Sequence, residues 1–421
     1  MGQSVFGNSL SRESGERKYG RWLQLVIGVV CMVMVANLQY GWTLFVNPMD
    51  QKYQWGRPAI QVAFTVFVVA QTWLAPFEGY VIDRFGQSLN VFVGGFLVGC
   101  AWVVNSLADS LAILYAGAAL GGIGAGMVMI SAFSIALKWF PERRGLALGL
   151  VAAGYGAGSS LTIIPVAHVI STWGYASAFF VFGLIQGGAI ILCSLFLRKP
   201  PQAADSRQDT HGVLQRDYRP VEVLRTPVFW VMYAMFVMVC AGGIIIAAQI
   251  ALIATDLQVA KVPVSVLGIT LPALSFALAF DRITNGISRP LFGWISDRIG
   301  REKTMLLAFS LEAASIYALC FLVKDPLMFI LLSGVVFLAW GEIFSIFPAL
   351  CTDIFGSQFA TTNYGLLYTA KGTASLLVPL SSVLVSITGS WDSVFILVAL
   401  FDVFTAIMAV TLLPTFRKSL R

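Results

Sequence analysis

Three cationic side chains, Arg282, Arg289 and Lys371, lie deep inside apolar stretches of this 421-residue chain. A charged side chain at the centre of a bilayer costs about 2.5–3.5 kcal/mol on insertion scales. It persists there where it faces a watery cavity, pairs with an acid or receives an anion. Two such cations on facing helices would make a receptor for one small dianion or one carboxylate, so the sequence predicts a pathway for anions.

The segment 280–290 places Arg282, Asn285 and Arg289 on one face of a helix, with Asp281 beside that face. A guanidinium presents a fixed fork that matches a carboxylate with two parallel hydrogen bonds. The alternative is an Asp281–Arg282 or Asp281–Arg289 pair that only fastens helices together. That alternative is stronger for Arg282 than for Arg289, so Arg289 is the better candidate for binding an anion.

Lys371 shares a helix face with Tyr368, and the residues around it are small enough to let its ammonium enter a cavity. The alternative, a lysine that snorkels to the membrane surface, needs a position near a helix end. Aromatic and amide residues on other helices are candidate walls of the same cavity, with ordinary packing as their alternative: Asn37, Tyr40, Leu44, Asn47, Gln61, Trp340, Phe344 and Phe347.

Three further charged residues are candidates for proton coupling or charge compensation: Asp281, Arg282 and Glu342. A carboxyl group removed from water can carry a proton near neutral pH. By contrast, no arrangement of residues indicates catalysis, a nucleotide loop, a metal site or a bound cofactor. The six cysteines are scattered without CxxC spacing and read as packing residues. We therefore expect a protein that is not an enzyme and that uses no cofactor.

The composition excludes an ordinary soluble domain, because hydrophobic residues make up 58% of the chain and charged residues only 11%, against about 25% in soluble domains. The apolar stretches are long enough to cross a bilayer as helices. The expected fold is an all-α membrane protein with twelve transmembrane helices, at 21–47, 60–83, 89–108, 110–138, 146–170, 174–197, 227–255, 264–296, 303–323, 327–352, 362–388 and 392–414.

The positive charges predict the orientation of these helices. Of the 27 Lys and Arg residues, 20 fall in the chain ends and the even-numbered connections, and four fall in the opposite connections. Positive residues gather on the cytoplasmic side of membrane proteins. We therefore expect a multi-pass protein of the cytoplasmic (inner) membrane with both termini in the cytoplasm. The net charge of +6 then reflects topology and indicates no nucleic-acid partner.

The two halves of the chain repeat one motif, since Gly79–Gly86 and Gly293–Gly300 share the pattern Gly-x-x-x-Asp-Arg-x-Gly. Two copies of a six-helix unit predict two pseudo-symmetric bundles that rock about a site between them. The charged members of the motif are candidate gating residues: Asp83, Arg84, Asp297 and Arg298. The expected segments are an N-terminal segment (1–20), a first bundle (21–197), a central loop (198–226), a second bundle (227–414) and a tail (415–421).

The repeated motif resembles the signature of the major facilitator superfamily. Within it, the segments 39–48, 138–145, 285–290 and 363–371 resemble the oxalate/formate antiporter family and, more distantly, the monocarboxylate transporters. The resemblance implies that Arg289 and Lys371 bind the substrate. It also implies that four further residues line the cavity: Tyr40, Gln61, Trp340 and Tyr368. Phe344 and Met129 stand where that family is expected to have tyrosines.

The expected function is secondary active transport of a small carboxylate, by exchange of the oxalate/formate type through alternating access. The alternative is a proton-coupled symporter of monocarboxylates such as lactate or pyruvate, in which Glu342 or Asp281 compensates the cations. A carboxylate sensor that does not transport is a third reading, and the chain lacks an appended cytoplasmic domain for it. The expected partners are the anion, protons in the symport alternative and membrane lipid, and the expected state is a monomer.

Overall fold

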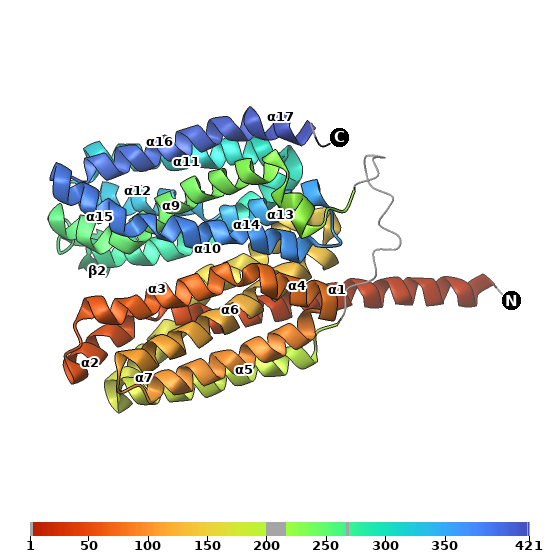
Figure 1. Cartoon of the computed structure of the whole chain (residues 1–421), viewed down its shortest axis with the longest axis horizontal. Coiled ribbons are helices and arrows are strands. Elements are labelled where there is room, and N and C mark those ends of the chain that lie inside the picture. Colours follow the sequence, from red (N-terminus) through yellow and green to blue (C-terminus); the bar gives the residue numbers. More distant parts are fainter. Residues whose placement is uncertain (1–2, 199–215, 267–268, 419, 421) are drawn as a thin grey trace.

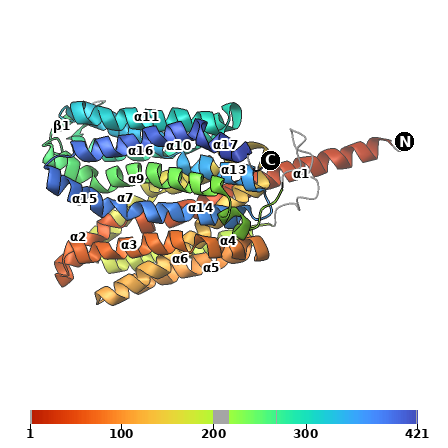
Figure 2. The ribbon, with the colours of Figure 1, turned by 45° about the horizontal axis from the view of Figure 1, so that its top comes forward.

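The computed structural model describes residues 3–198, 216–266, 269–418 and 420. Its helices form two layers, one from each half of the sequence (Figure 1). The first turns of α1 extend beyond the bundle, at the end where α17 also lies (Figures 1 and 2). We call this the terminal end, and we call the opposite end, where β1 and β2 lie, the hairpin end.

The N-terminal half contains six spans built from helices that are partly broken. The breaks fall at Gly41, at the 43° bend between α3 and α4, and at Gly174, whose φ of 83° reverses the chain inside α7. The elements are α1 (Gln3–Tyr40), α2 (Thr43–Tyr53), α3 (Arg57–Trp73), α4 (Ala75–Phe85), α5 (Gln87–Ser106), α6 (Leu111–Trp139), the short helix η1 (Pro141–Arg143) and α7 (Arg144–Leu195).

The C-terminal half repeats this plan and adds a short helix before its first span. Its tenth and eleventh spans are each broken near the middle of the span, at Gly341 and Leu376. The elements are α8 (Pro220–Leu224), α9 (Pro227–Asp256), β1 (Pro263–Val266), β2 (Ile269–Pro272), α10 (Ala273–Ile299), α11 (Arg301–Leu322), α12 (Pro326–Trp340), α13 (Ile343–Phe355), α14 (Ala360–Ser375), α15 (Leu377–Thr388), α16 (Asp392–Val410) and α17 (Leu412–Lys418).

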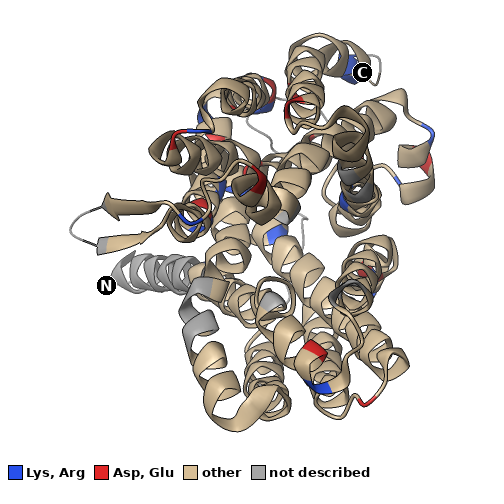
Figure 3. Cartoon of the chain, turned by 90° about the vertical axis from the view of Figure 1, so that its left-hand side faces the viewer, with Lys and Arg blue, Asp and Glu red and all other residues tan. Residues whose placement is uncertain are grey.

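The expected start of the eighth span was wrong. The helix predicted over 264–296 begins at Ala273, because Pro263–Val266 and Ile269–Pro272 pair as antiparallel strands, with Pro263 opposite Pro272. The run is apolar and rich in β-branched residues, which favour extended backbone. The hairpin projects from the rim of the bundle when the molecule is viewed from that end (Figure 3). Within the predicted N-terminal segment 1–20, α1 is helical from Gln3.

Eight helices of the described part are long and apolar enough to cross a membrane, and the bent pair α3–α4 makes a ninth. The three spans outside this set are the first part of α7, α10 and the pair α14–α15. Two of them carry the intramembrane cations, since Arg282 and Arg289 lie on α10 and Lys371 lies on α14. All three intramembrane cations thus lie on two spans of the C-terminal half.

The two halves meet where α7 packs against α10 and α4 packs against α14. Glycines make the approach close at both places. A Cβ added to Gly293 on α10 would overlap the carbonyl oxygen of Gly145 on α7, and a Cβ on Gly79 would lie 2.7 Å from the carbonyl oxygen of Thr361 on α14. The repeated motif glycines thus bring the halves into backbone contact at two equivalent positions.

Candidate functional site between the two halves

Arg289 is buried at the contact between α10 and α7, with 2% of its surface exposed. Its Nη1 donates to the carbonyl oxygen of Ala152 at 2.6 Å, and its Nη2 donates to Asn285 Oδ1 at 3.0 Å. Its Nε has no hydrogen-bond partner in the described part of the chain. The guanidinium is therefore held in place by two neutral acceptors and keeps one donor free.

Lys371 is the second buried cation, with 5% of its surface exposed. Its Nζ donates to Tyr368 Oη at 3.0 Å on the same helix and to Gln71 Oε1 at 3.3 Å on α3, across the interface. Among the described residues, neither Lys371 nor Arg289 forms an ion pair with a carboxylate. A buried charge without a counter-ion is costly, and an anion beside these two cations would offset that cost.

The ring of Phe344 on α13 lies against both cations. Its centroid is 4.9 Å from the Arg289 guanidinium carbon and 5.7 Å from Lys371 Nζ. Trp340 packs edge-on against the same ring at 5.7 Å, and Tyr368 does so at 6.4 Å. One phenyl ring is thus surrounded by four predicted substrate-binding residues: Arg289, Lys371, Trp340 and Tyr368. The sequence placed these residues on separate helix faces and did not predict that they meet at Phe344.

Two residues that the sequence did not single out complete a polar chain beside Lys371. Tyr155 Oη donates to Gln39 Oε1 at 2.6 Å and accepts from Gln71 Nε2 at 3.1 Å, while Gln71 Oε1 accepts from Lys371. Gln71 is an amide in the apolar middle of the second span, and that isolation was the available signal. Tyr155 lies in a run of small residues that predicts close helix packing and gives no signal for its hydroxyl group.

Tyr40 lies at the edge of this cluster. Its ring packs edge-on against Tyr155 at 5.4 Å, and the Arg282 guanidinium carbon lies 4.4 Å from its centroid. Arg282 therefore contacts the other half of the molecule through an aromatic ring and forms no ion pair with Asp281 among the described residues. The side chain of Gln61, the remaining predicted cavity residue, lies outside the described part of the structure.

The acidic candidates stand apart from the two buried cations. Asp281 is buried beside Ser333 on α12. Glu342 is fully buried at the break between α12 and α13, where its electrostatic neighbour is another buried acid, Glu312. In the described part, neither Asp281 nor Glu342 pairs with Arg289 or Lys371. The site therefore keeps two cations without a neighbouring carboxylate.

The repeated pattern of the two motifs has a shared geometry at the terminal end. Asp83, at the end of α4, accepts from the backbone N–H of Thr362 at 2.9 Å and from its hydroxyl at 2.7 Å, at the beginning of α14. Lys138 donates to the same carboxylate at 2.8 Å. A carboxylate at a helix N-terminus satisfies backbone donors that the helix leaves free. Asp83 thus joins the first half to the second.

Asp297 makes the equivalent contact in the opposite direction. Its two oxygens accept from the backbone N–H groups of Gly145 and Leu146 at 3.0 and 2.9 Å, at the start of α7. Arg301 pairs with Asp297 at 2.6 Å and with Asp353 at 3.0 Å, and Asp353 also receives Arg144 of the first half at 2.7 Å. The halves are therefore joined at the terminal end by two symmetric carboxylate contacts.

The motif arginines take a different position. Arg84 donates to Tyr80 Oη at 2.9 Å, and Arg298 stacks on Trp294 with its guanidinium carbon 3.9 Å from the ring. Each arginine therefore contacts an aromatic residue of its own helix. In the described structure, the aspartates and not these arginines make the contacts that cross between the halves.

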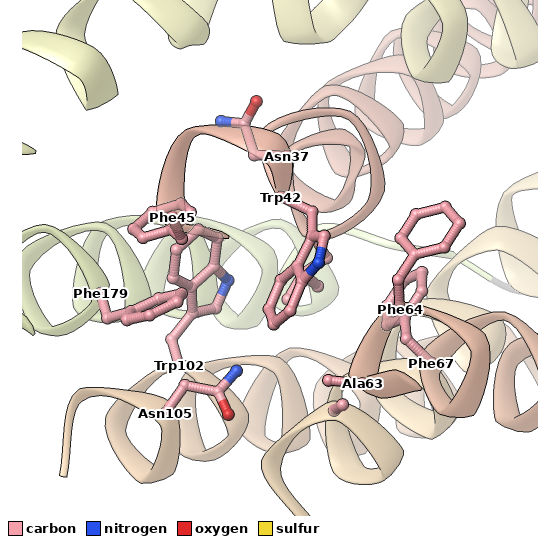
Figure 4. A pocket seen from close by; sticks show the side chains of 11 residues that line it. Asn37, Trp42, Phe45, Ala63, Phe64, Phe67, Trp102, Asn105 and Phe179 are labelled. Carbon is pink, nitrogen blue, oxygen red and sulfur yellow. The ribbon is translucent and has the colours of Figure 1, made fainter. Parts of the chain in front are cut away.

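A separate, small pocket lies inside the N-terminal half (Figure 4). Aromatic rings and two amides line it, and the side-chain polar groups of Asn37, Trp42 and Trp102 have no hydrogen-bond partner in the described part. Its lining comes from α1–α3 and α5–α7 and includes neither buried cation. This pocket is therefore distinct from the cluster around Phe344.

Two six-helix halves, a buried polar site between them and a repeated motif are the plan of a membrane transporter built from two parallel repeats. Comparison with known proteins agrees. The family model of the Major Facilitator Superfamily matches residues 25–280 and 241–419. Among solved structures, the proton:xylose symporter XylE matches with a TM-score of 0.71 at 13% identity over 94% of this chain and 97% of that one. The chain belongs to the major facilitator superfamily.

Its relatives place it more narrowly. The oxalate:formate antiporter of Oxalobacter formigenes is 33% identical over 397 residues, which cover 94% of this chain and 92% of the antiporter. Monocarboxylate transporter 12-B of Danio rerio is 22% identical over 358 residues, which cover 77% of this chain and 72% of the relative. Within the superfamily, the chain thus belongs with the oxalate:formate antiporter, as its motifs predicted.

Proposed function

We propose that the protein exchanges small carboxylate anions of the oxalate and formate kind across the cytoplasmic membrane, as a monomer with both termini inside. One observation carries the proposal: Arg289 and Lys371 are buried against the same ring, and neither has a carboxylate partner in the described part. The name of the 33% identical relative supports the same class of substrate.

The two cations divide the work of binding. Arg289 is oriented by Ala152 and Asn285, which leaves its Nε for the ligand. Lys371 supplies a point charge that can turn from Tyr368 and Gln71 toward an anion. Trp340 Nε1 is buried without a partner in the described part and is available as a neutral donor, while Tyr40 closes the cluster on the side of the first half.

Electrostatics favour exchange over net transport. Two unit charges about 8 Å apart in an effective dielectric of about 20 repel by about 2 kcal/mol. They also lose hydration when the site closes. A bound anion offsets both terms, so the loaded carrier closes more readily than the empty one. If no acid takes over this role, only loaded carriers cross the membrane, and transport is obligate exchange.

Alternating access requires the terminal end to open and close, and the two aspartate contacts are suited to that role. Asp83 and Asp297 hold helix N-termini of the opposite half through hydrogen bonds. Rocking of the two bundles would break both contacts together. Arg84 and Arg298 would then act at the membrane surface, beside the contacts that open.

Proton-coupled symport of a monocarboxylate is the second candidate. Two observations favour it. The buried carboxyl oxygens of Asp281 and Glu342 have no hydrogen-bond partner in the described part. Monocarboxylate transporters are also among the relatives. A proton on either acid could accompany the anion. A sensor that binds without transport has no comparable observation in its favour.

Transport into proteoliposomes of purified protein tests the proposal. Labelled oxalate, formate, lactate and pyruvate are offered to vesicles preloaded with the same unlabelled anion. We expect uptake of oxalate or formate, and we expect Lys371→Gln to abolish oxalate uptake while sparing some uptake of a monoanion. Undiminished oxalate uptake by Lys371→Gln would contradict the two-cation site, and selective lactate or pyruvate uptake would favour the symporter.

A further inference from the structure

Arg282 lies on the approach to the buried site from the hairpin end. It precedes Arg289 by seven residues on α10, which is two helical turns, or about 10 Å, along the same face. Because α10 runs from the hairpin toward the terminal end, Arg282 is the outer of the two arginines. The aspartate contacts close the terminal end, so a ligand entering this form of the protein comes from the side of Arg282.

The guanidinium of Arg282 has free donors. Its side chain is only partly buried, and it has no hydrogen bond or salt bridge among the described residues. The ring centre of Tyr40 lies 4.4 Å from its guanidinium carbon. An arginine that stacks on an aromatic ring keeps the N–H groups along its edge available for a planar carboxylate.

A polar chain links this position to the buried pair. Tyr40 packs on Tyr155, Tyr155 accepts a hydrogen bond from Gln71, and Gln71 accepts one from Lys371. The neighbouring acid, Asp281, is buried beside Ser333 on α12; it interacts electrostatically with Arg282 but forms no salt bridge with it in the described part. An anion at Arg282 would thus displace no salt bridge and would have hydroxyl and amide groups on its inward side.

We propose that Arg282, stacked on Tyr40, is a second anion-binding station that takes carboxylates from the hairpin side and passes them to Arg289 and Lys371. The inference rests on the proposed function and extends it to the entry route. A cation at the mouth of a low-dielectric passage raises the local concentration of anions and the rate of their capture, by tenfold or more in favourable cases. The station therefore acts on one side of the membrane only.

The test compares Arg282→Gln with Lys261→Gln, which removes the same charge from an exposed position at the hairpin end. Labelled oxalate transport is measured in intact cells, where the hairpin end faces out in the proposed orientation, and in inverted membrane vesicles. We expect Arg282→Gln to raise KM about tenfold from the hairpin side, with kcat and the opposite KM unchanged. Added salt should weaken wild-type capture more than that of the variant.

Three outcomes would overturn the station: an equal rise of KM on both sides, an Arg282→Gln profile that matches Lys261→Gln, or complete loss of transport by folded Arg282→Gln. Arg282→Lys keeps the charge without the planar fork, so its KM from the hairpin side should lie between those of the wild type and Arg282→Gln. This second variant keeps the test valid if the glutamine variant misfolds. Failure of the wild-type protein to transport oxalate, formate or any related carboxylate would instead contradict the proposed function itself.

Discussion

Arg289 and Lys371 contact the same phenyl ring, although they lie on different helices of the C-terminal half. Phe344, on the second part of the broken tenth span, is 4.9 Å from one cation and 5.7 Å from the other. Both positive charges therefore lie against one apolar ring in a buried, low-dielectric part of the protein. Its quadrupole also stabilises both of them while no anion is bound.

Replacing Phe344 tests that arrangement. Phe344→Leu keeps an apolar side chain but removes the quadrupole, so the cations lose an attraction that is worth about 0.5–2 kcal/mol each. We expect a weaker and less ordered site, with KM for the anion raised about tenfold in uptake assays. Phe344→Tyr, which keeps the ring, should retain most of the affinity, and Phe321→Leu, at an exposed position, should behave as wild type. Equal kinetics for Phe344→Leu and wild type would remove the ring from the account.

Arg289 should not tolerate its nearest chemical substitute. In Arg289→Lys, one ammonium cannot serve Ala152 O and Asn285 Oδ1 and still offer the free edge that Nε provides. A lost hydrogen bond to a charged group costs about 1.5–3 kcal/mol. We expect kcat/KM to fall about tenfold to a hundredfold, measured as initial rates of exchange. The matched control is Arg225→Lys, at an exposed position outside the spans, and a similar loss there would point to a general effect of the substitution.

The close approach of α7 and α10 should be intolerant of a single methyl group. In Gly293→Ala, the new Cβ would overlap the backbone carbonyl of Gly145, which cannot move as a side chain can. We expect separation of the halves at the terminal end and loss of exchange, with a lower melting temperature of the purified protein. Gly188→Ala is the control, because a Cβ there meets no atom within 4 Å. If both variants keep wild-type stability and rates, the backbone contact does not matter.

The aspartate contacts should govern access from the terminal end. Asp83→Asn with Asp297→Asn removes two carboxylates that hold helix N-termini across the interface, together with their ion pairs to Lys138 and Arg301. We expect the terminal end to open more often.

Access to the interface reports this opening. Ser134 is buried and accepts a hydrogen bond from Thr361 across the interface at 3.0 Å, so Ser134→Cys in a chain without other cysteines is a suitable probe. Its labelling by a thiol reagent should accelerate in the double variant. Asp325→Asn alters a carboxylate that caps its own helix at the other end, and it should leave labelling unchanged. Equal labelling rates in all three proteins would argue against a gating role.

Much of the fold was accessible from composition and period alone. Long apolar stretches and the repeated motif predicted two six-helix halves, and the family comparison confirms this fold class. The prediction failed where an apolar run could form either regular element. The run 264–272 has the hydropathy of a membrane helix, but it is rich in β-branched residues and flanked by prolines. Pro263–Val266 and Ile269–Pro272 are accordingly strands.

The site was only partly accessible, for a different physical reason. Arg289 and Lys371 stood out because a membrane makes isolated charges rare. Gln71 and Tyr155 are neutral, and what distinguishes them is a hydrogen-bonded chain between separate helices, which a helical period does not encode. Asp83 and Asp297 were predicted as gating residues from the repeated motif. That they accept hydrogen bonds from backbone N–H groups of the opposite half could not be predicted, because it depends on how the halves pack.

The most direct test of the central claim is the dependence of uptake on what the vesicle contains. Labelled oxalate is supplied to proteoliposomes that hold unlabelled oxalate, formate or no anion, with and without an imposed pH gradient. An uncompensated pair of cations at Arg289 and Lys371 predicts uptake into anion-loaded vesicles only, at a rate that the gradient does not change. Uptake into empty vesicles that follows the pH gradient would contradict obligate exchange and would mean that a buried acid such as Glu342 or Asp281 carries a proton with the anion.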